Sequence, residues 1–140
     1  MESLKRFEEA HQQHFEKAFA EIKSGKKLTH WMWFIFPQIK GLGLSETAKY
    51  YAIENKMEAK NFLDHPVLGA NLRSITAELL RLKTNNPTEV LGKPDDMKLH
   101  SCMTLFSSIP GATDIFEKVL AKYFDGKQDL QTIKFLDIQE

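Results

Sequence analysis

A chain of 140 residues, 42% hydrophobic and 11% aromatic, is long enough to bury one hydrophobic core without disulfides or a structural metal. Nineteen Lys and Arg residues balance nineteen Asp and Glu residues, which argues against a nucleic acid as the main partner. No apolar run approaches the ~20 residues of a membrane span, and the charged N-terminus lacks the apolar segment of a secretory signal. With a single cysteine, Cys102, these features predict a reduced, cytoplasmic protein without a membrane partner.

The N-terminal segment predicts an amphipathic helix that Ser3 caps and Gly25 ends, because serine is favoured at N-caps and glycine just after helices. Its apolar positions recur with the 3.6-residue period of an α-helix. They are Leu4, Phe7, His11, Phe15, Ala18 and Ile22.

Two histidines of this helix raise the question of a metal site. His11 lies at the centre of the apolar stripe and His14 lies one turn on at its edge, a spacing at which two imidazoles can share a metal. No Cys, Asp or Glu is placed with them in sequence. We therefore expect His11 to pack in a half-buried seam with one nitrogen hydrogen-bonded, and we expect neither a metal nor another cofactor.

Both tryptophans of the chain fall in HWMWFIFPQIKGLGLS, residues 30–45. The Phe-Pro step favours extended backbone, and Gly41 and Gly43 permit unusual dihedral angles, so the end of this stretch is predicted to be a structured loop. Ser45 then caps a short helix beginning ETAKYYAI. Because two tryptophans spaced by two residues cannot share one helix face, we expect one in the core and the other at a pocket, with Gln38 supplying hydrogen bonds.

Helix-capping signals divide the rest of the chain. Asn55 with Glu58 three residues later predicts a capping box, and His65-Pro66 predicts the start of the next helix, since proline is favoured at the first helical position. That helix carries an uninterrupted apolar stripe of Leu68, Leu72, Ile75, Leu79 and Leu82. Further helix starts are predicted at Asn86, at Pro94-Asp95-Asp96, at Thr113 or Asp114 and at Asp129, with stops at Gly92 and Gly126.

The sequence predicts an all-α fold, because no segment shows the clear period-two alternation of a half-buried strand. No repeat or linker is visible, so residues 1–140 are expected to form a single domain of about six to eight mostly short helices. Such short helices are marginal alone, and tertiary packing must hold them. The expected core includes Leu68, Leu72, Ile75, Leu79, Val119 and Leu120.

The helix that begins near Pro94 carries the polar groups best placed for chemistry. Helical spacing puts Lys98 at the edge of an apolar arc, with Ser101, Thr104 and Ser108 in one neighbouring sector. A lysine three residues before a serine resembles, in reversed order, the pair in which a desolvated amine activates a hydroxyl. In the structural alternative, the hydroxyls bond back to carbonyls one turn earlier. Cys102, on the apolar arc, is expected to be a buried, unreactive thiol.

Four stretches together resemble a known family: HWMWFIFPQIKGLGLSETAKYYAI, EAKNFLDHPVLGANL, LGKPDDMKLHSCMTLF and VLAKYFDGKQDLQTIKFL. They resemble the domain of unknown function 1810 family, small proteins mostly from bacteria and sometimes mislabelled calpastatin, over nearly the whole chain to Leu136. The resemblance implies a mainly helical fold and supplies no activity. At Cys102 the chain departs from the family's Ser-Ser-Met-Thr-Leu-Phe pattern, which argues further against a cysteine nucleophile. The family's signature polar and aromatic positions correspond here to His30, Trp31, Trp33, Gln38, Ser45, Tyr51, His65, Lys98, Ser101 and Thr104.

The first hypothesis for function is a small-molecule pocket between HWMWFIFPQ and KLHSCMT. There an indole stacks a planar ring, and Lys98 with neighbouring hydroxyls meets an anionic group, as in a nucleotide-like or other anionic metabolite. Lys98 and Ser101 are the candidate catalytic residues, and the other signature positions are the candidate ligand-binding residues. In a hydrolase or transferase, Lys98 would steady developing negative charge while Ser101 or a bound water attacks.

The second hypothesis is an interaction module, in which an exposed part of the tryptophan and Phe-Pro segment docks a protein partner. The position of the second tryptophan distinguishes the two hypotheses. A concave pocket that also holds Gln38 and Lys98 favours the small molecule, and a flat exposed aromatic patch favours the protein partner. The sequence leaves open whether the protein is an enzyme and what its oligomeric state is.

Overall fold

Helices account for all the regular structure in residues 4–139, the part of the chain that the computed structural model describes. The predicted all-α fold is confirmed, with nine helices in this part against the six to eight expected, because three single turns, α2, α3 and α6, are counted among them. Ser3, the expected first cap, lies outside the described residues. The helices are α1 (Lys5–Lys23), α2 (Met32–Ile35), α3 (Glu46–Tyr50), α4 (Lys56–Asp64), α5 (Leu68–Arg81), α6 (Pro87–Leu91), α7 (Asp95–Ser107), α8 (Ile115–Phe124) and α9 (Leu130–Gln139).

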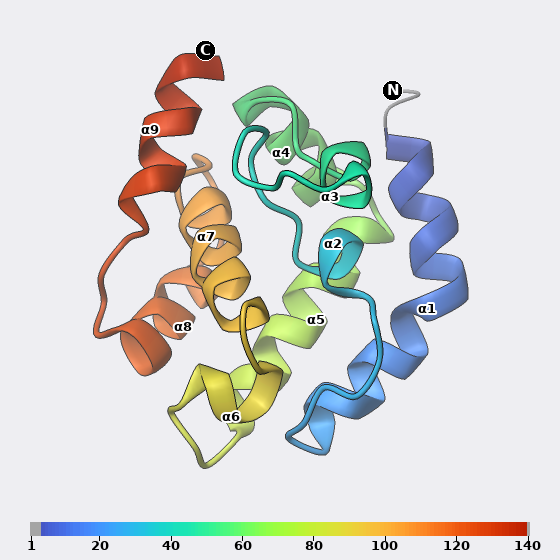
Figure 1. Cartoon of the computed structure of the whole chain (residues 1–140), viewed down its shortest axis with the longest axis vertical. Helices are drawn as coiled ribbons and strands as arrows, with labels where there is room; N and C mark the ends of the chain where they lie inside the picture. The colour runs from blue at the N-terminus through green and yellow to red at the C-terminus, as the bar shows by residue number, and fades with distance from the viewer. Residues whose placement is uncertain (1–3, 140) are drawn as a thin grey trace.

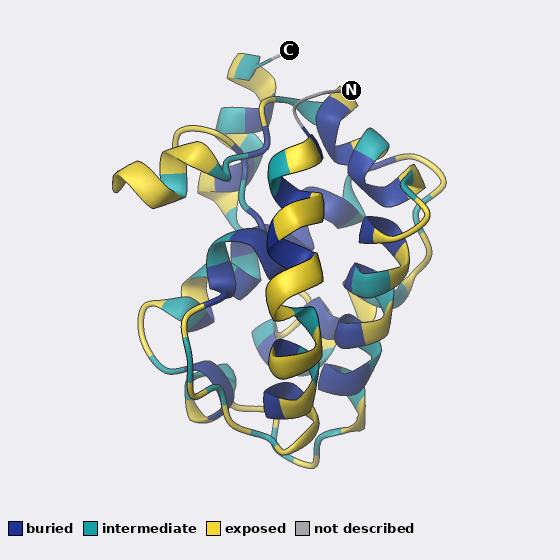
Figure 2. Cartoon of the chain, turned by 90° about the vertical axis from the view of Figure 1, so that its right-hand side faces the viewer, coloured by how far each residue is buried: buried dark blue, intermediate teal, exposed yellow. Residues whose placement is uncertain are grey.

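The helices surround one hydrophobic core. The helix α5 packs against α1 on one side and against α8 on the other, and α7 packs against α8 and α9 (Figure 1). The helix α1 turns an exposed face outward and a buried face toward the core (Figure 2). All six expected core side chains are buried: Leu68, Leu72, Ile75, Leu79, Val119 and Leu120. Within residues 4–139, no helix is both long and apolar enough to cross a bilayer.

Local capping signals set most helix boundaries, as predicted. The side chains of Ser45, Asn55 and Asn86 each accept a hydrogen bond from a backbone N–H in the first turn of the helix that follows. Gly25 follows the end of α1 with a φ of +89°, a backbone conformation that favours glycine. The capping box at Asn55 is only half formed, because the Glu58 carboxylate accepts the N–H of Glu54 instead of that of Asn55.

One boundary and one capping contact differ from the predictions. The helix α5 begins at Leu68, two residues after Pro66, and the His65 Nδ1 accepts the N–H groups of Val67 and Leu68 at 3.1 Å each. The His65 imidazole therefore accepts the backbone N–H groups at the start of α5, although Val67 occupies the N-cap position. Asp114 occupies the N-cap position of α8, yet within the described chain its side chain makes no capping hydrogen bond.

Glu21 holds the segment between α1 and α2 and decides which tryptophan lies in the core. Its carboxylate accepts hydrogen bonds from the N–H groups of Leu28 and Thr29, the Thr29 hydroxyl, and the Trp31 indole Nε1–H at 2.8 Å. Burial raises the pKa of Glu21, but these hydrogen bonds outweigh it and bring the pKa to about 2. Trp31 is thereby fixed in the core, where it is 1% exposed.

His11 is buried among aromatic rings with both of its nitrogens hydrogen-bonded, one more than expected. Its Nε2 lies 2.8 Å from the Phe34 carbonyl oxygen and its Nδ1 lies 3.1 Å from the Asn71 amide nitrogen. Since a carbonyl only accepts, Nε2 carries the proton and Nδ1 accepts from Asn71. Burial lowers the pKa of His11 to about 4. His14 is exposed, and residues 4–139 contain no group of three His, Cys, Asp or Glu side chains arranged to hold a metal.

Candidate functional site

A narrow cleft between α2, α7 and the chain that follows α2 brings together Trp33, Gln38, Tyr51 and Lys98, all expected at a ligand site. Apolar side chains, including Met32 and Phe36, complete its walls. The cavity has a volume of about 10 Å³, which is room for about one water molecule. Burial raises the pKa of Tyr51, with a further contribution from the neighbouring Tyr50. The cleft contains four of the ten expected site residues and is closed.

Lys98 stands at the edge of the cleft beside the second tryptophan. Its Nζ lies 5.7 Å from the centre of the Trp33 ring, within the range of a cation–π contact. The same ammonium lies 3.5 Å from the Asp95 Oδ1, and the other oxygen of Asp95 lies 2.9 Å from the Lys27 Nζ. Two ammonium groups therefore share one carboxylate next to the cleft.

Ser101 lies behind the cleft, one turn after Lys98. The side-chain amide of Gln38 donates a hydrogen bond of 2.7 Å to the Ser101 hydroxyl, which in turn donates to the Lys98 carbonyl at 3.2 Å. Across residues 4–139, no carboxylate or imidazole is hydrogen-bonded to Ser101. The neighbouring Cys102 is fully buried, and burial raises the pKa of its thiol well above the usual range.

A surface loop of residues 40–52, which we call the cover loop, closes the cleft. The chain leaves and returns at one place, where the N–H of Lys40 donates to the Ile53 carbonyl and the N–H of Ile53 donates to the Gln38 carbonyl, both at 2.8 Å. Such a loop, with its ends together, is an Ω-loop. Gly43 and Ala48 of the cover loop line the cleft, and no residue of Glu46–Tyr50 is buried.

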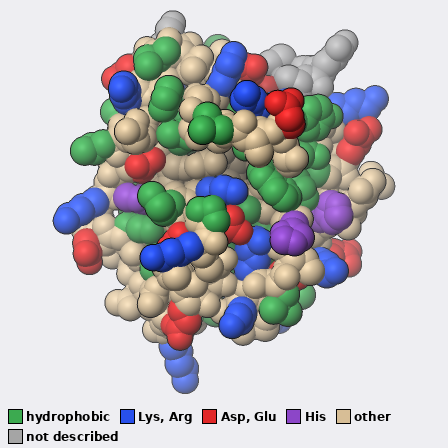
Figure 3. Space-filling model, in the orientation of Figure 1, with side chains coloured by type: hydrophobic (Ala, Val, Ile, Leu, Met, Phe, Trp, Pro, Cys, Tyr) green, Lys and Arg blue, Asp and Glu red, His purple; other side chains and the backbone are tan. Residues whose placement is uncertain are grey.

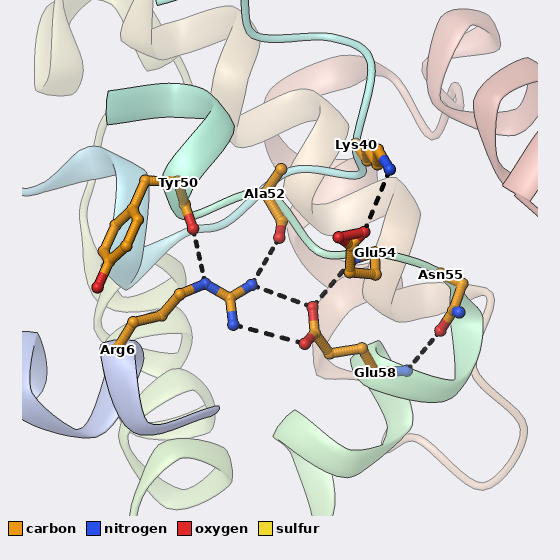
Figure 4. A network of polar contacts seen from close by, with 7 residues as sticks. All are labelled: Arg6, Lys40, Tyr50, Ala52, Glu54, Asn55 and Glu58. Atoms are coloured by element: carbon orange, nitrogen blue, oxygen red, sulfur yellow. Dashed lines mark hydrogen bonds and ion pairs between the residues drawn. The ribbon is translucent and has the colours of Figure 1, made fainter. Parts of the chain in front are cut away.

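Arg6 of α1 holds the returning end of the cover loop (Figure 4). Its guanidinium donates hydrogen bonds of 2.7 Å to the carbonyls of Tyr50 and Ala52, and it pairs with the Glu58 carboxylate at 3.1 Å. Figure 4 shows the guanidinium between this end of the loop and Glu58. A charged group half-buried among carbonyls fixes the loop end more firmly than neutral hydrogen bonds do.

The helix α9 holds the outgoing end of the cover loop. The ring of Phe135 lies so close to Gly41 that an added Cβ would come within 2.7 Å of it, and Gly41 has a φ of +110°. The side chain of Gln139 donates a hydrogen bond of 3.4 Å to the Lys40 carbonyl. Only glycine satisfies both the backbone angle and the approach of the ring.

The other expected site residues lie away from the cleft or have structural partners. Trp31 is in the core, Ser45 caps α3, and His30 is exposed in the loop before α2. The His65 Nδ1 accepts an N–H group at the start of α5, and the His65 Nε2 lies 3.6 Å from a Glu8 oxygen. The Thr104 hydroxyl donates to the His100 carbonyl and accepts the N–H of Asp129, so it joins α7 to the start of α9.

Charges of both signs are interspersed on the face shown in Figure 3. None of the expected residues lines a second, wider hollow. That hollow, about 400 Å³ and open, lies between α4 and the Ile109-Pro110 turn, with Met57 and Lys60 in its walls. Within the described chain, its lining includes no aromatic side chain that could stack a planar ring. We therefore take the small cleft at Trp33 as the candidate site.

The comparisons with known proteins agree with this fold. A family described as "Protein of unknown function (DUF1810)" matches residues 1–136. The chain is also similar to the crystal structure of a conserved hypothetical protein, Rv1873 from Mycobacterium tuberculosis, with 40% sequence identity, a TM-score of 0.93 and 96% of each chain covered. No curated protein matches the chain.

Proposed function

The chain belongs to the DUF1810 family, whose description names no activity, and we propose from its own geometry that the cleft binds a small ring-bearing, anionic metabolite. The observation that carries the proposal is the shared position of Trp33, Gln38 and Lys98 in one concave cleft. An indole face stacks a planar ring, an ammonium pairs with an acidic group, and an amide fixes orientation. A nucleotide-like molecule has this combination of groups.

Ligand entry requires the cover loop to open, because about 10 Å³ holds no metabolite. The architecture of the loop supports such a motion: its two ends meet at Ile39 and Ile53, while its middle buries no side chain of Glu46–Tyr50. Lids over ligand sites are commonly built this way, since a loop with fixed ends opens at little cost to the core. The closed cleft is the resting state in this proposal.

Binding is better supported than covalent catalysis by Ser101. A serine nucleophile needs a base that takes its proton, and the Ser101 hydroxyl donates to the Lys98 carbonyl, which cannot act as one. If the protein is a hydrolase or transferase, Lys98 steadies negative charge and a bound water is the attacking group. In either case Ser101 positions Gln38.

The second candidate function is docking of a protein partner, and it would use the outer side of the cover loop. Leu44 is 80% exposed and Tyr50 is 60% exposed, so the cover loop presents two apolar side chains to solvent. Two such side chains make a small patch, whereas docking surfaces bury several hundred Å². Trp33, the tryptophan outside the core, lines the cleft.

A thermal-shift panel of nucleotides, nucleosides and aromatic acids tests the proposal. A ligand at 100 times its dissociation constant adds ~2.7 kcal/mol to stability, and we expect at least one compound to reach a shift of this order. Lys98→Met keeps the aliphatic stem and removes the charge, so it should reduce the shift by about half or more without lowering the melting temperature. Lys93→Met, at an exposed lysine outside the cleft, is the matched control and should retain the shift. A shift of equal size in Lys98→Met and in the parent protein would overturn the proposal.

A further inference from the structure

We propose that the group meeting Lys98 carries a single negative charge, as a carboxylate or a phosphodiester does, and not the two charges of a terminal phosphate. This inference rests on the proposed function of the cleft and specifies its ligand. It comes from three side chains that the sequence analysis did not combine: Lys27 from the loop after α1, and Asp95 and Lys98 from the first turn of α7.

These three side chains form a closed set of charges. Asp95 lies 2.9 Å from the Lys27 Nζ and 3.5 Å from the Lys98 Nζ. Throughout residues 4–139, neither lysine pairs with another carboxylate, and Asp95 pairs with no other cation. Two positive charges and one negative charge leave an excess of one positive charge beside Trp33.

The excess charge belongs to Lys98, the most accessible member of the set. The exposed fractions of the side chains are 9% for Lys27, 16% for Asp95 and 24% for Lys98. Asp95 lies closer to Lys27, the deeper lysine, and only Lys98 lines the cleft. A ligand acid can therefore pair with Lys98 while Asp95 remains with Lys27, and the result is two neutral pairs.

A second negative charge on the ligand would have no cation to pair with, because Lys27 remains paired with Asp95 and Lys98 is paired with the first charge. This second charge would lie within a few ångströms of Asp95, in a cleft whose walls are mainly apolar. Like charges at such distances repel strongly where the effective dielectric is low. We expect a dianion to bind on the order of tenfold more weakly than a monoanion of the same shape.

Three probes that share a benzene ring separate these cases: benzoate, phenyl phosphate and benzamide. At pH 8 they carry one, two and no negative charges, because the second pKa of a phosphate ester is about 6. The chain has two tryptophans, hence two indole N–H signals in a nitrogen–proton spectrum. Trp33 reports on the cleft, and Trp31, hydrogen-bonded to Glu21 in the core, is the internal control. We expect benzoate to shift the Trp33 signal at concentrations about tenfold below those needed for the other two probes.

Two variants test whether the preference for benzoate comes from the charges of Lys27, Asp95 and Lys98. Asp95→Asn removes the repulsion, so phenyl phosphate should bind at least as tightly as benzoate. Lys98→Gln should remove the advantage of benzoate over benzamide, whereas Lys93→Gln, with the same change in net charge, should leave it intact. An unchanged Trp31 signal shows that each variant is folded. If Asp95→Asn does not fold, the comparison of Lys98→Gln with Lys93→Gln tests the inference by itself.

The possible failures are distinct. If all three probes shift Trp33 at the same concentration, the cleft binds rings without regard to charge, so the charge inference is wrong and the cleft remains a binding site. Tighter binding of phenyl phosphate than of benzoate by the parent protein would likewise refute the single charge. If no probe shifts Trp33 at any concentration, both the inference and the proposed function fail.

Discussion

The side-chain nitrogen of Gln38 lies 2.7 Å from the hydroxyl oxygen of Ser101, and this hydrogen bond joins the loop after Pro37 to the middle of α7. Ser101 is buried, and its own proton is donated to the Lys98 carbonyl. The pair therefore fixes one wall of the cleft relative to the helix that carries Lys98. We expect the pair to have a positional role, and a substitution can separate that role from a catalytic one.

Ser101→Ala should lower the free energy of unfolding by about 1 kcal/mol, because the Gln38 amide loses its acceptor. Ligand binding at the cleft should weaken by a similar amount, roughly fivefold, without disappearing. Ser108→Ala is the control, since the Ser108 hydroxyl donates only to the Leu105 carbonyl one turn earlier. Urea unfolding and ligand titration measure both effects. Complete loss of a turnover with unchanged binding would identify Ser101 as a nucleophile instead.

The buried His11 should make stability depend on pH below neutrality. Its pKa is lowered, chiefly by burial, from 6.5 to about 4 in the folded protein, so below pH 6.5 the unfolded chain binds a proton that the folded chain does not. The free energy of unfolding is therefore unaffected by protonation of His11 above pH 6.5. It decreases by up to about 3 kcal/mol as the pH falls toward 4. Urea unfolding from pH 7.5 to 4.5 measures this loss. His11→Gln should flatten the dependence in this range, and an equal slope in parent and variant would refute the assignment.

Thr76 in α5 should tolerate loss of its hydroxyl. The side chain is fully buried, and within residues 4–139 its Oγ1 has no hydrogen-bond partner. Thr76→Val replaces it by a methyl group of similar size and should raise the free energy of unfolding by about 1 kcal/mol. Thr132→Val is the matched control, because Thr132 is equally buried and donates to Asp129 at 2.6 Å. Melting temperatures should move in opposite directions, and a comparable loss in both variants would contradict this prediction.

Gly41→Ala should loosen the cover loop. The substitution places a Cβ about 2.7 Å from the Phe135 ring and strains a backbone with a φ of +110°. Gly111→Ala provides the control, since its φ is +83° and nothing lies within 4 Å of the added atom. Hydrogen exchange followed by mass spectrometry should show faster exchange in the cover loop for Gly41→Ala only. Equal exchange in the two variants would mean that α9 does not hold the loop closed.

The parts of the fold that sequence predicts well depend on neighbours along the chain. The caps at Ser45, Asn55 and Asn86 act on N–H groups two or three residues away, and the buried stripe of α5 follows from helical spacing alone. The choice of core tryptophan is different. It depends on Glu21 accepting the Trp31 indole across the turn after α1, and no local pattern encodes that contact.

The candidate site was predictable in its residue types and not in its surroundings. Gln38 and Lys98 were expected beside one of the two tryptophans, and they lie in one cleft with Trp33. Asp95 lies three residues before Lys98, so its pairing was visible in the helical spacing, whereas Lys27 reaches it only through the fold. The Arg6 contacts that hold the cover loop span more than forty residues and are likewise invisible to sequence reasoning.

The most direct test of the cleft as a ligand site is a crystal structure of the protein with the strongest compound from the thermal-shift panel. We expect the compound's ring to lie against the Trp33 indole, its acidic group to lie at the Lys98 ammonium, and residues 40–52 to be displaced outward from Phe135. A compound bound in the hollow between α4 and the Ile109-Pro110 turn, with the cover loop still closed over Trp33, would contradict it.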